Sequence, residues 1–95
     1  QSSKRIVLWG ASLFLEKFLE KYNIQTNNII GIIDKNPCRK GDHIGLYEIF
    51  PPEAINELKP DEIIITIINS AKERALEVKQ FIKENYDGEI EIKTI

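Results

Sequence analysis

The chain has 95 residues, 42% of them hydrophobic, and a net charge of −2 at pH 7, which suits one small domain with one core. Its charge argues against a nucleic-acid partner, because neutralising phosphates requires clustered Lys and Arg. The single cysteine, Cys38, excludes an internal disulfide, and no apolar run approaches the ~18 residues of a membrane span.

The beginning of the sequence indicates a domain taken from a longer protein. It contains no methionine and starts with Gln-Ser-Ser, and no signal peptide is visible. We therefore expect residues 1–4 to be a disordered or cloning-derived lead and residues 5–95 to be a single domain excised from a larger cytoplasmic protein. An adjoining domain of that protein is then an expected partner.

The first apolar run, residues 6–9, predicts a strand that is covered on both faces, as in a parallel sheet. Gly10 ends the run. From Ser12 to Tyr22 the apolar residues recur at helical spacing, which predicts an amphipathic helix, and Ser12 can cap its first turn.

The rest of the chain continues this alternation of apolar strands and helices. The β-branched runs at 28–33 and 61–68 give strong strand signals. Ser70 and Glu73 form a capping box at the start of a predicted helix. We expect the charged residues of this helix to form an exposed face. The predicted elements are a strand at 28–33, a polar loop at 38–46, a short edge strand at 46–50, a short helix within 51–60, a strand at 61–68, a helix at 71–86 and an edge strand at 90–92.

This order predicts an α/β fold. We expect a three-layer open sheet, mostly parallel, of about four or five strands, with helices on both faces and right-handed crossovers.

Ligands of such sheets bind beyond the carboxyl ends of the strands, near the point where the strand order reverses. Three polar segments should meet there, and a helix that begins at this edge presents free amides to an anion. The predicted cofactor-binding residues are Gly10, Ala11, Ser12, Asp34, Lys35, Asn36, Asn69 and Ser70.

Two interpretations of this edge stay open. Gly10, Ser12 and Leu15 stand where a dinucleotide-binding loop has three glycines. Ser12 takes up space near a pyrophosphate, and Leu15 blocks close approach of helix and strand, so a plain strand–helix turn competes with a nucleotide contact. Asp34 could accept a ribose hydroxyl or could bond nearby amides in a turn. Ser70 is better suited to a helix cap than to a ligand group.

Several short motifs resemble those of a known family. In order and spacing they are similar to the Rossmann-like domain at the C-terminal end of bacterial sugar C-methyltransferases, and to nucleotide-sugar-binding domains of other sugar-modifying enzymes. The residues that carry the resemblance are Gly10-Ala11-Ser12, Asp34-Lys35-Asn36-Pro37, Lys40-Gly41, Ile44-Gly45 with Phe50-Pro51, and Pro60-Asp61.

The resemblance implies a non-catalytic Rossmann-like module of a larger transferase in sugar metabolism or polysaccharide biosynthesis. Such a module would bind a nucleotide sugar or NAD(P), with residues 10–12 facing phosphate, Asp34 a hydroxyl and Asn69 the adjacent face. The alternative is a scaffold or homodimerisation domain without a small-molecule ligand. No nucleophile–base pair or set of metal ligands is visible, so no catalytic or metal-binding residue is predicted.

Overall fold

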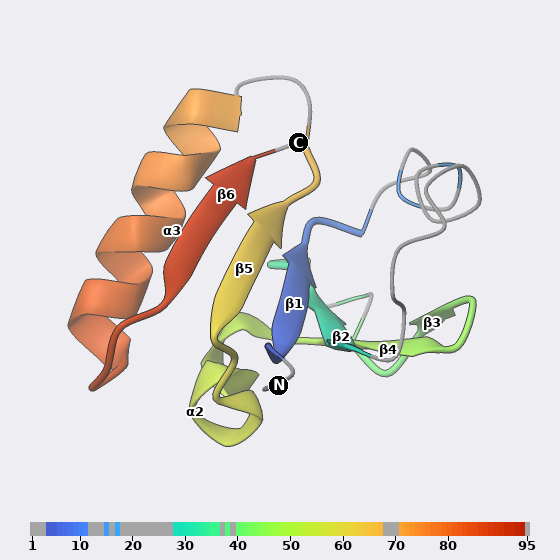
Figure 1. The fold of residues 1–95 in the computed structure, drawn as a ribbon. Helices are drawn as coiled ribbons and strands as arrows, with labels where there is room; N and C mark the ends of the chain where they lie inside the picture. Colours follow the sequence, from blue (N-terminus) through green and yellow to red (C-terminus); the bar gives the residue numbers. More distant parts are fainter. Residues whose placement is uncertain are drawn as a thin grey trace.

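The computed structural model describes residues 4–11, 15, 17, 28–36, 38, 40–67 and 71–94. Its described part is an α/β structure around one six-stranded sheet with the strand order β3-β4-β2-β1-β5-β6 (Figure 1). The strands are β1 (Ile6–Trp9), β2 (Ile29–Ile33), β3 (His43–Ile44), β4 (Tyr47–Phe50), β5 (Glu62–Ile65) and β6 (Glu91–Thr94). The helices are the 3-10 turn η3 (Pro52–Ala54), α2 (Ile55–Leu58) and α3 (Ala71–Asn85).

The α/β class is confirmed, and two details of the predicted sheet are corrected. The pairings β1–β2, β1–β5, β2–β4 and β5–β6 are parallel, but β3–β4 is antiparallel. The sheet therefore has six strands, where four or five were expected, and it is mostly parallel as expected except for the antiparallel β3–β4 pair. The missed strand lies inside the predicted polar loop, where Ile44 pairs with Tyr47 across a turn at Gly45. Because β3 covers β4, the segment 46–50 is not an edge strand.

The apolar strand residues divide between the two faces of the sheet and form two cores. The first core takes alternate residues of β1 and β5 together with residues of the helices. The second lies on the opposite face and contains a larger share of β2 and β4. The first comprises Val7, Trp9, Ile33, Ile55, Ile63, Ile65, Val78 and Ile82, and the second Leu8, Ala11, Leu15, Ile29, Ile32, Ile44 and Ile49.

Helix α3 covers the first face through Val78 and Ile82, which are almost fully buried. It lies alongside β6, as Figure 1 shows. Of the predicted helix at 12–22, only Leu15 and Lys17 are described. Both are helical, and Leu15 is fully buried in the second core. No helix in the described part of the chain is long and apolar enough to cross a membrane.

A cluster of four charged residues joins the amino ends of β1, β5 and β6. Glu62 is almost buried, and Lys4 and Lys93 reach its carboxylate at 3.4 and 3.5 Å. Lys4 also contacts Glu91 at 3.1 Å. Hydrogen bonds to Glu91 and then to Glu62 raise the pKa of the Lys4 ammonium, and the hydrogen bond from Lys4 lowers the pKa of the Glu91 carboxyl.

These two pKa shifts make the cluster favour folding at neutral pH. The Glu91 contribution is present above the ordinary pKa of a glutamate and is lost as the pH falls through the lowered value. The Lys4 contribution is present below the ordinary pKa of a lysine and is lost as the pH rises through the raised value. Both groups are exposed, so salt screens the effect.

Gly31 lies in β2 directly after a shift of register against β1, and it leaves room for an aromatic ring. A Cβ atom there would lie 2.8 Å from Cε2 of Phe50. We expect Gly31→Ala to lower the free energy of unfolding by about 1–2 kcal/mol, since the overlap outweighs the usual gain from replacing glycine in a strand. Urea unfolding followed by circular dichroism measures this. The loss should shrink in a Phe50→Leu background, and a Gly31→Ala protein as stable as the wild type would contradict the packing.

Candidate functional site

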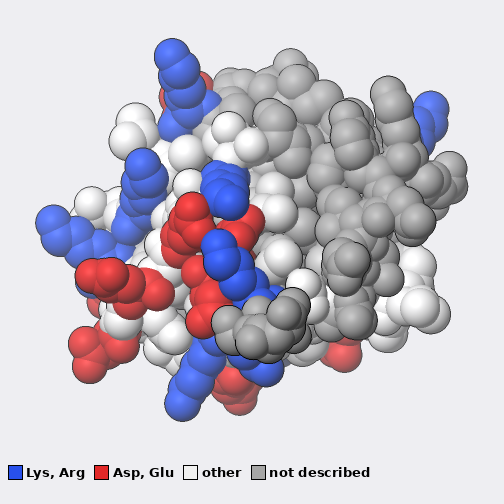
Figure 2. Space-filling model, viewed as in Figure 1, with Lys and Arg blue, Asp and Glu red and all other residues white. Residues whose placement is uncertain are grey.

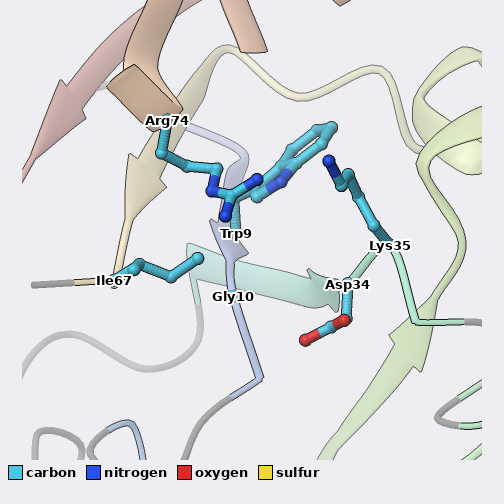
Figure 3. Close-up of a pocket in the computed structure, with 6 residues that line it drawn as sticks. All are labelled: Trp9, Gly10, Asp34, Lys35, Ile67 and Arg74. Atoms are coloured by element: carbon cyan, nitrogen blue, oxygen red, sulfur yellow. The ribbon is translucent and has the colours of Figure 1, made fainter. Parts of the chain in front are cut away.

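Three chain segments meet at the carboxyl edge of the sheet, because β1 lies between β2 and β5 and runs parallel to both. Gly10 follows β1, Asp34 follows β2 and Ile67 follows β5. They enclose a pocket of about 130 Å³ (Figure 3). Its lining residues are Trp9, Gly10, Asp34, Lys35, Ile67 and Arg74.

Gly10 makes the turn at the centre of this edge, and only glycine fits its conformation. Its φ of +119° lies in a region that L side chains rarely adopt. A Cβ atom would also lie 2.6 Å from Cγ1 of Ile67. The Gly10 N–H donates to the Ile33 carbonyl at 2.8 Å. On the other side, the buried Thr66 hydroxyl lies 2.7 Å from the Gly10 carbonyl and 3.0 Å from that of Trp9. Both neighbouring strands thus hold the turn.

Asp34 fastens the end of β2 to the segment that leaves β1. Its Oδ2 accepts the Ala11 N–H at 2.8 Å and its Oδ1 accepts the Asn36 N–H at 2.8 Å. Asn36 in turn accepts the Cys38 N–H at 3.0 Å. These bonds are those of a turn, yet a carboxylate offers about four acceptor positions, so Asp34 retains capacity for a ligand hydroxyl. The Ala11 N–H, predicted to face a phosphate, donates to Asp34.

Arg74 brings a positive charge from α3 to the same pocket. Its Nη1 lies 2.6 Å from Oε1 of Glu77, and Nζ of Lys35 lies 3.5 Å from the same oxygen. The Nε of Arg74 is buried and has no hydrogen-bond partner among the described residues. A buried donor without a partner is costly, so this N–H is suited to an incoming acceptor.

A second hollow of about 250 Å³ adjoins the first, and the two share Trp9 and Lys35. The second is the more apolar, and Trp9 meets Phe81 there edge to face, with ring centroids 5.9 Å apart. Neither hollow alone reaches the roughly 300–1,000 Å³ of small-molecule sites, whereas the two together fall within that range. The second hollow is lined by Trp9, Lys35, Pro52, Glu77, Val78 and Phe81.

The structure thus brings together three of the predicted site residues, Gly10, Asp34 and Lys35, at one pocket. Ala11 and Asn36 contribute backbone donors to Asp34. The predicted residues Ser12, Asn69 and Ser70 lie outside the described residues. Whether any of these eight residues binds a cofactor stays a prediction.

Sequence reasoning missed Trp9, Ile67 and Arg74 as lining residues. Arg74 was part of a helix face that was taken as exposed. Its position near the start of α3 was a usable signal, because helical side chains lean toward the N-terminus of their helix and α3 begins at the carboxyl edge of the sheet.

The described residues outside these two hollows offer little alternative chemistry. Among the described residues, no three His, Cys, Asp or Glu side chains are grouped so that they could hold a metal ion. Figure 2 shows Lys and Arg interspersed with Asp and Glu, so the described part of that face presents no extended surface of one sign. The pocket at Gly10 is therefore the candidate functional site.

The chain is similar to one described family and to solved structures of a repressor. The family described as C2185-like, N-terminal, matches residues 2–92. No curated protein matches the sequence. The crystal structure of RSP, a Rex-family repressor, is similar with a TM-score of 0.69 at 16% identity, over 99% of this chain and 53% of that one. RSP in complex with β-NADH gives a TM-score of 0.67 at 16% identity, over 98% and 53%. The chain thus spans about half the length of these structures.

These findings correct the resemblance to sugar C-methyltransferases and the function drawn from it. The matching family and the similar structures do not support a module of a sugar-modifying transferase or a role in polysaccharide biosynthesis. The physical reason is that the shared motifs serve the fold. Gly10 makes a turn that a side chain would block, Asp34 ties two turns together, and Gly41 bonds back to the Ile49 carbonyl at 2.9 Å. Any sheet with these connections favours such residues.

Proposed function

The chain belongs to the C2185-like, N-terminal family, and from the geometry around Gly10 we propose that it is a Rossmann-like domain that binds a dinucleotide of the NAD(H) class. The dinucleotide would lie across the carboxyl ends of β1, β2 and β5. The strand order supports this finer fold assignment, because β4-β2-β1-β5-β6 reverses direction at β1, which is where open α/β sheets bind nucleotides. The similarity in fold to RSP with bound β-NADH supports the choice of ligand.

One observation carries the proposal: the Asp34 carboxylate is held beside the Gly10 turn with acceptor capacity to spare. Two backbone N–H groups fix its two oxygens at 2.8 Å each, so the carboxylate is oriented before any ligand arrives. An acid at the end of the second strand of such a sheet is the group that accepts ribose hydroxyls. The apolar hollow beside Trp9 and Phe81 is suited to a flat ring.

The exclusion of a nucleic-acid partner was based on the net charge of this domain alone. It does not extend to the whole protein. Two structures of similar fold are those of a repressor, of which the chain spans about half. We propose that this domain takes the nucleotide and that any contact with nucleic acid is made by other parts of the protein. An adjoining domain and a second copy of the chain stay as predicted partners.

Trp9 provides a direct test, because it is the one tryptophan of the chain and lines both hollows. Reduced nicotinamide absorbs where tryptophan emits. Addition of NADH should therefore quench Trp9 and produce sensitised nicotinamide emission, and should shift the amide resonances of Gly10, Ala11 and Asp34. NAD⁺ should shift the same amides without energy transfer. If millimolar NADH leaves both the emission and the amide resonances unchanged, the proposal is wrong.

A further inference from the structure

We propose that Arg74 and Lys35 form a cationic clamp for the diphosphate of the ligand, and that Glu77 is an internal counter-anion which the bound diphosphate replaces. This inference rests on the proposed dinucleotide function. It adds Arg74 and Glu77, which were predicted to lie on an exposed helix face, and it assigns a charge role to Lys35, which was already a predicted cofactor-binding residue.

The clamp is built from two elements that are far apart in the sequence. Lys35 follows β2 and Arg74 comes from α3, and both line the pocket at Gly10. Figure 3 shows them on either side of Trp9, with the Arg74 side chain extended toward the end of β1. Both cations contact one oxygen, Oε1 of Glu77, at 2.6 and 3.5 Å. One carboxylate oxygen thus marks a point that both cations can reach.

The Arg74 guanidinium is only partly satisfied by this carboxylate. Nη1 has Glu77 as its partner, but Nε is buried without one among the described residues. A guanidinium binds phosphate best when two of its N–H groups donate together. In the structure Glu77 accepts from Nη1 alone. A phosphate at the pocket would accept from both Nε and Nη once the Arg74 side chain turns to expose its buried Nε.

The opposite wall of the pocket explains why such a clamp is needed. In a glycine-rich loop the backbone amides that follow the first strand contact the pyrophosphate. Here the Ala11 N–H donates to Asp34 at 2.8 Å, and Leu15, at the third glycine position, is fully buried in the second core. Lys35 and Arg74, on the other side of the pocket, would supply a diphosphate with the positive charge that the backbone after β1 supplies less well.

Charge balance then gives Glu77 its role. The side chains of Asp34, Lys35, Arg74 and Glu77 have no net charge together, so a diphosphate meets two carboxylates as well as two cations. The Glu77 side chain is 56% exposed and that of Lys35 60%. Glu77 can therefore swing into water when a diphosphate takes its cations, which costs little for an exposed ion pair. Loss of its negative charge should favour the anionic ligand.

Titration of the full chain with ADP, inorganic diphosphate and adenosine tests the clamp. Glu77→Gln should bind ADP and NADH about three- to tenfold more tightly than the wild type, because it frees two cations and removes one repulsion. Arg74→Gln should bind ADP about tenfold more weakly, since a charge-assisted bond is lost. Adenosine, which has no phosphate, should bind all three proteins alike. In the Arg74→Gln background, the gain from Glu77→Gln should fall by more than half.

Two matched variants on α3 serve as controls. Glu84→Gln removes the same charge from a glutamate whose described partner is Gln80, and Lys83→Gln removes a cation that lines the groove beside β6. Neither variant should change the affinity for ADP by more than about twofold, because these charges lie outside the lining of the pocket and salt screens exposed charges.

The outcomes separate the two proposals. If the wild type binds NADH and Glu77→Gln binds ADP no better, the clamp is overturned and the dinucleotide function stands. If Glu77→Gln raises the affinity for adenosine as much as the affinity for ADP, the substitution acts on the shape of the pocket. The clamp is then again overturned. If neither the wild type nor Glu77→Gln binds any of these ligands, both proposals fall.

Discussion

Gly10→Ala is expected to remove roughly 2–5 kcal/mol of folding free energy, a large part of what a domain of this size possesses. Two costs combine at this residue. The backbone has a φ of +119°, which an L side chain rarely adopts, and the new Cβ would lie 2.6 Å from Cγ1 of Ile67. The turn has little freedom to yield, because Gly10 bonds the Ile33 carbonyl on one side and Thr66 bonds the Gly10 carbonyl on the other.

A pair of further variants separates the two costs. Gly45 has a φ of +62° in the β3–β4 turn, and a Cβ atom there would meet no atom within 4 Å. Gly45→Ala should therefore cost only about 1–2 kcal/mol, the backbone cost alone. Ile67→Ala in the Gly10→Ala background should recover stability through relief of the contact. Urea unfolding by circular dichroism measures all four proteins. A Gly10→Ala protein as stable as Gly45→Ala would show that the Ile67 contact yields freely.

The strands were predictable wherever burial on both faces left a continuous apolar run. The runs at 6–9, 28–33 and 61–68 contain β1, β2 and β5, which form the centre of the sheet. The predicted helix at 71–86 corresponds to α3 for the same kind of reason, because Val78 and Ile82 recur at helical spacing and face the core. The hydrophobic pattern of each of these elements comes from its own buried residues, so it can be read from the local sequence.

Features that depend on contact between distant segments could not be predicted in the same way. β3 has two residues, His43 and Ile44, too few for a periodic signal, and it exists because a turn at Gly45 folds it onto β4. The pairing of Lys35 with Glu77 crosses from β2 to α3. In sequence, Arg74 and Glu77 look like an ordinary i,i+3 ion pair on a solvated face. Only the packing of α3 over the end of β1 places them at a pocket.

The carboxyl edge itself was predictable, while its chemistry was ambiguous for a physical reason. Asp34 suited a turn and also a ribose hydroxyl, and the structure gives it the bonds of a turn while leaving acceptor positions free of any partner among the described residues. One side chain can do both, because a carboxylate fixed by backbone donors is also an oriented acceptor.

Asp34→Asn is expected to weaken NADH binding by between about 10- and 100-fold, the loss of hydrogen bonds to a charged group. An asparagine keeps the shape but offers one oxygen, so its amide N–H groups would oppose either the Ala11 or the Asn36 donor. The same change should lower the free energy of unfolding by roughly 1.5–3 kcal/mol. Asp87→Asn, an equal change of charge at an exposed residue after α3, should alter neither quantity by a measurable amount.

The two roles of Asp34 predict different responses to the ligand. If the carboxylate accepts a ribose hydroxyl, then Asp34→Asn should weaken the binding of adenosine as strongly as that of NADH, because both ligands contain the ribose. If Asp34 only ties the turns together, adenosine and inorganic diphosphate should lose affinity by the same factor, since a loosened turn affects every ligand of the pocket. The amide resonances of Ala11 and Asn36, which donate to Asp34 at 2.8 Å, report the state of the turn without any ligand. If a folded Asp34→Asn protein binds NADH as tightly as the wild type, Asp34 does not contact the ligand. The Gly10 turn would then have a structural role only.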